Sequence, residues 1–332
     1  MNKIKLSVTL AAFNVQDFIQ ESIGSILNQT FKDFELICID DASDDLTSQV
    51  LKEYAEDDNR IKLILKKENQ GLAVARNESL ELATGKYILF LDGDDIYDNT
   101  LFEKAVHLAE RERSDMVLWD YVTFYKKEEI FNLKTIPSDL LKLDASNKVA
   151  LLNRPAFTWV KLLRTEKLRE LKIDFPKGLT RQDIPVHWRL ITELEKISIL
   201  PERLSFYRQQ PGATTAKKDS KLFDLVYIMD IVEGKLKDQG NFSKYKREFY
   251  TQQLNFFHGM FDNIKDDYKQ KALVLIKERL STDHLKFLKS TKLVRPQTKY
   301  FLESISGKPF ASLQYASWKF ARKIYRTINS NL

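Results

Sequence analysis

The chain contains few of the residues that build cross-links or zinc clusters. Of 332 residues, one is cysteine and four are histidine. Cys38 alone cannot form an intrachain disulfide, which is typical of a reducing compartment, and its apolar neighbours predict a buried core residue. His107, His187, His258 and His284 lack the spacing of a zinc site. We therefore expect a protein of the cytoplasm without a structural zinc centre.

Long apolar runs are missing as well. No stretch approaches the roughly 20 consecutive apolar residues that a membrane-spanning helix needs. The N-terminal residues 1–6 lack the apolar core and cleavage site of a secretory signal. With 43% hydrophobic and 30% charged residues, the composition is that of a soluble globular protein and argues against wholesale disorder.

Positive charge is concentrated at the C-terminal end. The formal net charge is +6, but residues 284–332 hold ten lysines or arginines and one acid, a net charge of +9. Leu313 to Ile328 is amphipathic, and such a basic helix favours an anionic membrane surface at the inner face of the cell membrane. The alternative is a helix packed on its own domain with a solvated basic face. The expected apolar face comprises Leu313, Ala316, Phe320, Ala321, Ile324 and Ile328; the basic face comprises Lys319, Arg322, Lys323 and Arg326; Trp318 and Tyr325 flank them.

Strand-like and helix-like segments alternate up to about Thr123. This alternation predicts an α/β domain with a mostly parallel sheet, flanked by helices, that binds ligands beyond the carboxyl ends of its strands. From Thr123 prolines break the pattern, and beyond Leu222 it becomes helical. We therefore expect a catalytic domain over residues 1–215 and a smaller helical domain over residues 216–332. The expected strands are Leu6–Phe13, Phe34–Ile39, Ile61–Leu65, Tyr87–Leu91 and Met116–Tyr121.

Acidic residues follow two of these strands. In Asp92-Gly93-Asp94, residues two apart in an extended segment point to the same side, so both carboxylates could bind one divalent cation together with substrate phosphates. A solvated acidic turn is the alternative. For Asp40 and Asp41 the residues alone favour a helix cap.

Several ordered motifs together resemble family 2 of the nucleotide-sugar glycosyltransferases, of the bacterial cell-surface polysaccharide type, which have the Rossmann-like GT-A fold. The likeness covers about Lys5 to Thr215. The likeness rests on the following segments, which occur in the order typical of the family. They are Ser7 to Asn14, the expected first strand; Ser25 to Phe31; Phe34 to Asp45; Asn69-Gln70-Gly71 with Ala75-Arg76-Asn77; Gly85 to Asp95; Gln182-Asp183 with Trp188; and Tyr207-Arg208.

The resemblance implies a role for each matching position. Asp183 would be the catalytic base, Asp94 the direct metal ligand, and Asp92 a contact of the ribose and the metal shell. Donor binding would involve Ala11, Phe13, Asp41, Arg76 and Asp92; the acceptor or phosphate side would involve Trp188, Arg208 and Gln182. Three positions depart from the family pattern: Ala11 replaces a proline, Gln182 a glutamate and Gln210 a histidine.

The resemblance implies an inverting, metal-assisted glycosyltransferase. Its partners would be a nucleotide-diphosphate sugar, expected to be a UDP-sugar, Mn²⁺ or Mg²⁺, and a glycan, polyol-phosphate or lipid-linked acceptor. The sequence leaves the sugar, the base and any oligomer open, and shows no nucleic-acid module. Glycine-rich loops are missing after the first strand, which argues against a nucleotidyltransferase or a dehydrogenase. A non-catalytic protein that binds nucleotide-sugars or anionic surfaces is the alternative function. From the residues alone, other roles remain open. Arg76 would be a surface charge, Trp188 a core residue, and Arg208 a member of a structural ion pair.

Overall fold

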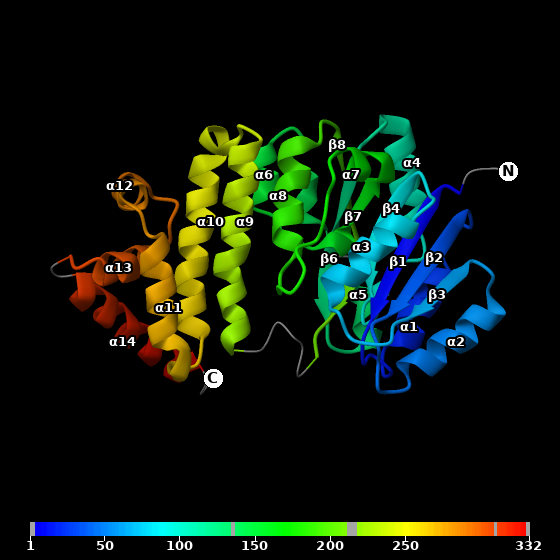
Figure 1. The fold of residues 1–332 in the computed structure, drawn as a ribbon, viewed down its shortest axis with the longest axis horizontal. Coiled ribbons are helices and arrows are strands. Elements are labelled where there is room, and N and C mark those ends of the chain that lie inside the picture. Colours follow the sequence, from blue (N-terminus) through cyan, green and yellow to red (C-terminus); the bar gives the residue numbers. More distant parts are fainter. Residues whose placement is uncertain (1–3, 134–136, 211–217, 309–310, 330–332) are drawn as a thin grey trace. The chain divides into compact units, whose positions relative to one another are not determined.

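The computed structural model describes residues 4–133, 137–210, 218–308 and 311–329. The chain forms two compact units, Met1–Ala213 and Thr214–Leu332 (Figure 1). The division expected at residue 215 lies within residues 211–217, outside the described residues.

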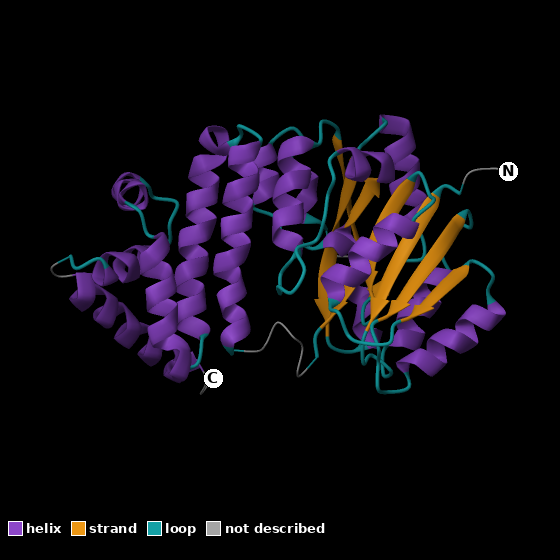
Figure 2. Cartoon of the chain, in the orientation of Figure 1, coloured by secondary structure: helices purple, strands orange, loops and turns teal. Residues whose placement is uncertain are grey.

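Unit 1 is built on an eight-stranded sheet in the order β3-β2-β1-β4-β7-β6-β8-β5 (Figure 2). The strands β3, β2, β1 and β4 are mutually parallel. The other half is mixed, because β7 is antiparallel to both β4 and β6, whereas β8 is parallel to β6 and antiparallel to β5. The expected parallel pairing thus runs through the whole first half and recurs in the second half only between β6 and β8. The strands are β1 Leu6–Ala12, β2 Phe34–Asp40, β3 Ile61–Leu65, β4 Tyr87–Asp92, β5 Ile96–Tyr97, β6 Met116–Phe124, β7 Lys161–Arg164 and β8 Ile197–Arg208.

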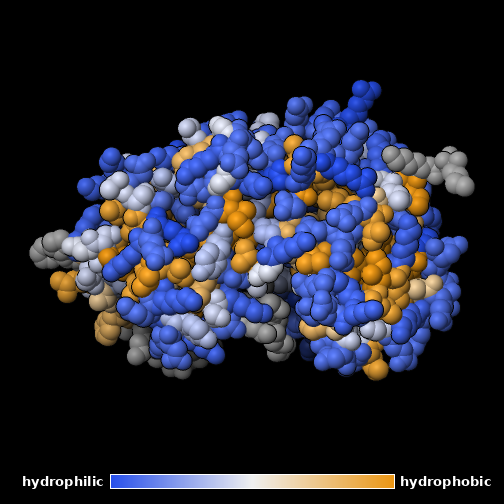
Figure 3. Space-filling model, viewed as in Figure 1, coloured by the Kyte–Doolittle hydropathy of each residue, from blue (hydrophilic) through white to orange (hydrophobic). Residues whose placement is uncertain are grey.

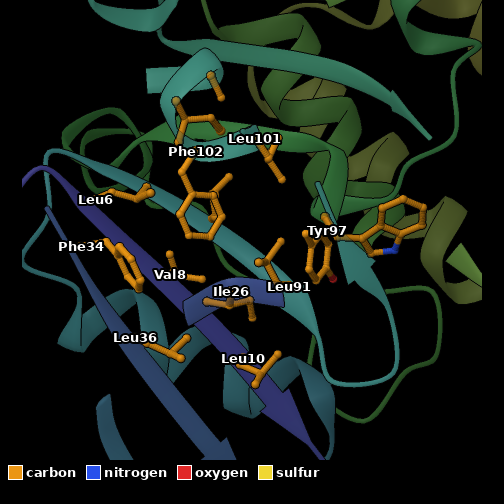
Figure 4. Packing of buried hydrophobic residues seen from close by; sticks show 14 of the residues in the cluster. Leu6, Val8, Leu10, Ile26, Phe34, Leu36, Leu91, Tyr97, Leu101 and Phe102 are labelled. Atoms are coloured by element: carbon orange, nitrogen blue, oxygen red, sulfur yellow. The ribbon is translucent and has the colours of Figure 1, made fainter. Parts of the chain in front are cut away.

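Helices cover both faces of the parallel half. Apolar side chains of β1, β2 and β4 pack against α1 and α4 on one face (Figure 4), and α3 contacts β1 and β2. All seven residues of β2 are buried, as expected for a strand covered on both sides, and Cys38 is fully buried as predicted. The helices of unit 1 are α1 Ile19–Leu27, α2 Thr47–Asp57, α3 Leu72–Leu82, α4 Leu101–Glu112, α5 Ile130–Leu133, α6 Lys148–Leu152, α7 Thr165–Glu170 and α8 Asp183–Glu193.

Unit 2 is helical in its described residues. Its helices are α9 Asp224–Asp238, α10 Phe242–Asn263, α11 Asp266–Arg279, α12 Thr282–Ser290, α13 Pro296–Ile305 and α14 Ala311–Asn329. Two buried histidines, His258 and His284, lie among aromatic rings of this unit. Within the described residues, no helix combines the length and the apolar composition needed to cross a membrane.

Candidate active site

The carboxyl end of β2 carries two buried aspartates with different partners. The Asp40 carboxylate accepts hydrogen bonds from the hydroxyls of Ser43 and Ser48. Asp41 accepts from the backbone N–H groups of Gln70 and Gly71, at 3.1 and 2.7 Å. Asp41 therefore fixes the loop that leads into α3. Neither aspartate caps α2, whose N-terminal cap position is Leu46, so the helix-cap alternative is wrong.

Arg76 is a buried cation at the centre of the candidate site. Its side chain, on α3, is 4% exposed, and the guanidinium lies over the ring of Phe175. The Nη2 atom donates to Oδ1 of Asp92 at 2.7 Å. The surface-charge alternative for Arg76 is therefore wrong. Ala11 lies beside Asp92 in the register between β1 and β4.

The loop after β4 is held by Arg208, the last residue of β8, and by Gln210 just beyond it. Asp94 accepts a hydrogen bond from the side-chain amide of Gln210, with Oδ2 and Nε2 2.9 Å apart. Arg208 donates from Nε to the Asp94 carbonyl, from its backbone N–H to Asp95, and from Nη2 to Glu21. Arg208 thus forms an ion pair with Glu21, as the structural alternative predicted. It also holds the segment Asp92 to Asp95, which we call the metal-motif loop.

Burial and like charge destabilise the ionised form of Asp94. Burial, reinforced by the charge of Asp92, raises the pKa of Asp94 to about 6. A Cβ atom at Gly93 would lie 3.3 Å from the Ile19 side chain, so a larger residue there would require that side chain to shift slightly. No group of three or more His, Cys, Asp or Glu side chains in the described part of the chain could hold a metal ion by itself. A cation at Asp92 and Asp94 would therefore take its remaining ligands from substrate phosphate and water.

Asp183 is the first residue of α8 and faces two cations. Burial raises the pKa of Asp183, while the charges of Arg76 and Lys161 oppose this shift. The charge of Asp92 also acts on Asp183, so the two carboxylates share the field of Arg76. Lys161 at the start of β7 is buried, and burial lowers its pKa to about 7. Asp92 therefore acts electrostatically on both Asp94 and Asp183.

Other predicted site residues lie less centrally. Phe13 follows β1 and is 46% exposed, whereas Gln182 is buried just before α8. Trp188 is only 2% exposed, which favours its interpretation as a core residue over an acceptor platform. A groove of about 610 Å³ lies between β3 and α3, but none of Asp92, Asp94 and Asp183 lines it.

Sequence reasoning missed Lys161 and the role of Gln210. Lys161 sits in an apolar run, Val160 to Leu163, that could have been recognised as a strand carrying a buried charge. Gln210 was noted only as a departure from the family pattern. Its contact joins residues 116 positions apart, which no local spacing reveals.

The model of "Glycosyl transferase family 2" matches residues 7–174, just over half of the chain. This chain belongs to glycosyl transferase family 2. EpsJ of Bacillus subtilis, an uncharacterized glycosyltransferase, is 30% identical over 219 residues, which are 63% of this chain and 62% of EpsJ. The glycosyltransferase GlyA of Streptococcus pneumoniae is 27% identical over 63% of this chain and 31% of GlyA. The matched region thus spans less than two thirds of the length of these relatives.

The fold of this chain is similar to that of solved structures. A fragment of TarS from S. aureus, in complex with UDP-GlcNAc, aligns with a TM-score of 0.69 and 19% identity over 97% of this chain and 92% of that one. The mannosyltransferase PcManGT from Pyrobaculum calidifontis, in complex with GDP-Man and Mn²⁺, gives a TM-score of 0.54 and 16% identity over 99% and 84%. The GT-A expectation for the fold is thereby confirmed.

Proposed function

We propose that this protein transfers a sugar from a UDP-sugar to an acceptor hydroxyl during assembly of a cell-envelope or capsule polysaccharide or a teichoic acid. The observation that carries the proposal is the grouping of Asp92 and Asp183 around the buried Arg76, with Asp94 beside them. Membership of family 2 supports the reaction class. The UDP-GlcNAc bound to TarS, a protein of the same fold, supports the donor class.

Asp94 and Asp92 are the residues that would hold a divalent cation, Mn²⁺ or Mg²⁺. The donor set fits, because two neighbouring carboxylates repel each other and a hard cation offsets that repulsion. The Mn²⁺ in PcManGT supports the choice of metal. When bound, the cation neutralises negative charge on the departing diphosphate.

The protein's own residues hold the reactants and move one proton. Arg76 offers a cation beside Asp92, on the side where the nucleotide is expected, and Asp41 keeps the neighbouring loop in place. Asp183 takes the proton of the acceptor hydroxyl as that oxygen attacks the anomeric carbon. Attack from the face opposite the diphosphate inverts the anomeric centre, and no covalent enzyme intermediate is needed.

Asp183→Asn tests the base. We expect turnover to fall about 10²–10⁴-fold, while binding of UDP with Mn²⁺ persists in calorimetry. Release of UDP from a panel of UDP-sugars, with and without glycan acceptors, is the activity measurement. Asp174→Asn is the matched control, because its side chain is 65% exposed and should leave turnover unchanged. Full activity of Asp183→Asn would remove Asp183 from the mechanism.

Asp94→Ala tests the metal site. We expect it to abolish the Mn²⁺-dependent part of UDP binding in calorimetry, because a direct ligand is lost. A wild-type protein that binds UDP-sugars with Mn²⁺ but releases no UDP with any acceptor would instead support the non-catalytic alternative.

The exposed face of α14 supports membrane association as a partner proposal. Helix α14 packs on its own unit through Tyr315, which is 9% exposed, and through the pair between Arg322 and Asp262. Leu313 and Phe320 are 66% and 68% exposed, and Figure 3 shows hydrophobic side chains at the surface over the end of unit 2 that carries α14. One face of the helix thus packs while another remains free for an anionic membrane surface. The predicted contributions of Ala321, Lys323, Ile324, Tyr325, Arg326 and Ile328 concern side chains outside the described residues.

Co-sedimentation with phosphatidylglycerol vesicles tests this partner. The double variant Leu313→Ser and Phe320→Ser should lose most binding, because the apolar contacts with lipid are removed while Tyr315 still packs. Val274→Ser, at a 47% exposed position on α11, is the control. Equal sedimentation of the double variant and the wild type would contradict membrane docking through α14.

A further inference from the structure

Four aromatic rings form a cluster that the reaction described above does not use. The rings of Tyr121, Phe157, Trp159 and Tyr207, which we call the aromatic cluster, lie 4.7–5.7 Å apart between centroids. Trp159 is 3% exposed, whereas the other three are only half-buried. One side of these three rings packs on the main core of unit 1, and part of each ring surface stays open.

The strand register places the cluster at the edge of the sheet that carries the carboxylates. In the antiparallel pair of β4 and β7, Leu89 lies opposite Leu162. The short helix η3, Thr158–Val160, directly precedes β7 and contacts β4, so it lies near the end of β4 that bears Asp92. Phe157 is the residue before η3. The cluster thus adjoins the metal-motif loop.

Lys161 links the cluster to the candidate base. Its Nζ atom donates to the carbonyl of Ala156 at 3.1 Å and to that of Phe157. The same ammonium group acts electrostatically on Asp183. Lys161 therefore hydrogen-bonds the segment that carries Phe157 and also acts electrostatically on Asp183, the candidate base.

Arg154, a side chain that can donate hydrogen bonds to sugar hydroxyls, lies beside the aromatic rings. Arg154 donates from Nη2 to Asp120 at 3.1 Å, and its side chain remains 30% exposed. Its charge acts on Tyr121, where it opposes the rise that burial causes in the pKa of that phenol. Half-buried aromatic faces with a few placed polar groups are typical of sites that bind sugars by their C–H faces and their hydroxyls.

We propose that Tyr121, Phe157 and Tyr207, whose rings are angled to one another (82° between Tyr121 and Phe157), form an angled platform against which the pyranose ring of the acceptor sugar packs, with Arg154 binding its hydroxyls. This inference rests on the proposed transferase function and assigns to the aromatic cluster the role expected of the buried Trp188. A small cavity of about 20 Å³, lined in part by Tyr121, Arg154 and Lys161, has room for one water but not for a sugar. The sugar would therefore lie outside this cavity, against the exposed parts of the rings.

Binding of methyl glycosides, without turnover, tests the platform. Methyl β-glucoside, β-galactoside and N-acetyl-β-glucosaminide would be titrated against the full chain with UDP and Mn²⁺, and saturation-transfer NMR would report the contact. We expect Phe157→Leu and Tyr121→Leu to weaken Kd about tenfold, because an aromatic face is lost. Tyr121→Phe should retain binding. Tyr125→Leu, which changes a 74% exposed tyrosine at the next position after β6, should also retain it.

The outcomes separate this inference from the transferase proposal. Unchanged sugar binding in Phe157→Leu and Tyr121→Leu, or no binding of any glycoside by the wild type, overturns the platform without touching the UDP-release assay. Binding of glycerol phosphate that depends on Arg154 but not on Phe157 also overturns it, in favour of a polyol-phosphate acceptor. Should one leucine variant fail to bind UDP, the other variant carries the test.

Discussion

The two units differ in the ionisable groups that they bury. Unit 1 buries acids and cations around its candidate site, among them Arg76, Asp95 and Lys161, together with one histidine, His187. In unit 2 the buried groups of interest are two neutral imidazoles.

His258 bonds Thr298 and Tyr315, and His284 bonds Gln253. Burial lowers the pKa of each histidine to about 4, so both are neutral near pH 7. A buried charge costs several kcal/mol unless it is paired, whereas a hydrogen-bonded neutral group costs little. The buried charges of unit 1, which cost free energy, lie where the reaction is proposed, whereas the neutral histidines of unit 2 cost little.

Removing the central cation of unit 1 should have the largest effect. Arg76→Met leaves Asp92 and Asp183 without a buried countercharge, and we expect a loss of about 3 kcal/mol in the free energy of unfolding together with weaker UDP binding. Arg279→Met is the matched variant in unit 2, because Arg279 pairs with a 40% exposed Asp230 and should cost at most about 1 kcal/mol. Urea unfolding of the full chain, followed by tryptophan fluorescence, measures both. Similar losses in the two variants would break the contrast between the units.

Removing the second cation should change the pH dependence of transfer. Asp183 must be ionised to act as a base, so kcat/KM falls as the pH falls through its raised pKa. The charges that act on it are Arg76, Lys161 and Asp92. Lys161→Met removes one opposing cation, raises the pKa of Asp183 further, and should move the acidic limb of the kcat/KM profile to higher pH.

Above pH 7 the two profiles should converge, because wild-type Lys161 loses its own proton near that pH. Lys167→Met, a change at an exposed lysine of α7, serves as the control. An acidic limb that stays in place in Lys161→Met would show that the ammonium group does not act on the base.

The sequence predicted the parallel half of the sheet better than the mixed half. In β2 and β4 a largely apolar run, broken only by Glu35, ends in aspartate, so the pattern locates both the strand and its functional edge. In β8, Pro201 and the charged residues after it looked like a break. Proline is tolerated there because the pairing with β6 is irregular between Trp119 and Tyr121.

The sequence could predict site residues only where they belong to short motifs. Asp92 and Asp94 share one motif, and the resemblance supplied Asp183, whose role stays a prediction. Helical spacing placed Trp188 on α8 but could not say which face of that helix the core would cover. The aromatic cluster joins residues from β6, β8 and the segment before β7, and only the folded sheet brings them together.

Acid should destabilise unit 2 through its neutral histidines, an effect that is absent at neutral pH and grows only below pH 6.5. Because the folded pKa of His258 and His284 is about 4 and the usual value is 6.5, the unfolded chain binds more protons between these two pH values. The contribution of each histidine to stability is therefore complete above pH 6.5 and is lost as the pH falls towards 4. The slope is at most about 1.4 kcal/mol per pH unit for each imidazole. His258→Gln should remove one such contribution from the pH dependence of thermal unfolding, whereas His107→Gln, at an exposed position of α4, should leave the slope as it is. An unchanged slope in His258→Gln would mean that His258 is not held neutral in the folded unit, and the contrast with the charged interior of unit 1 would then fail.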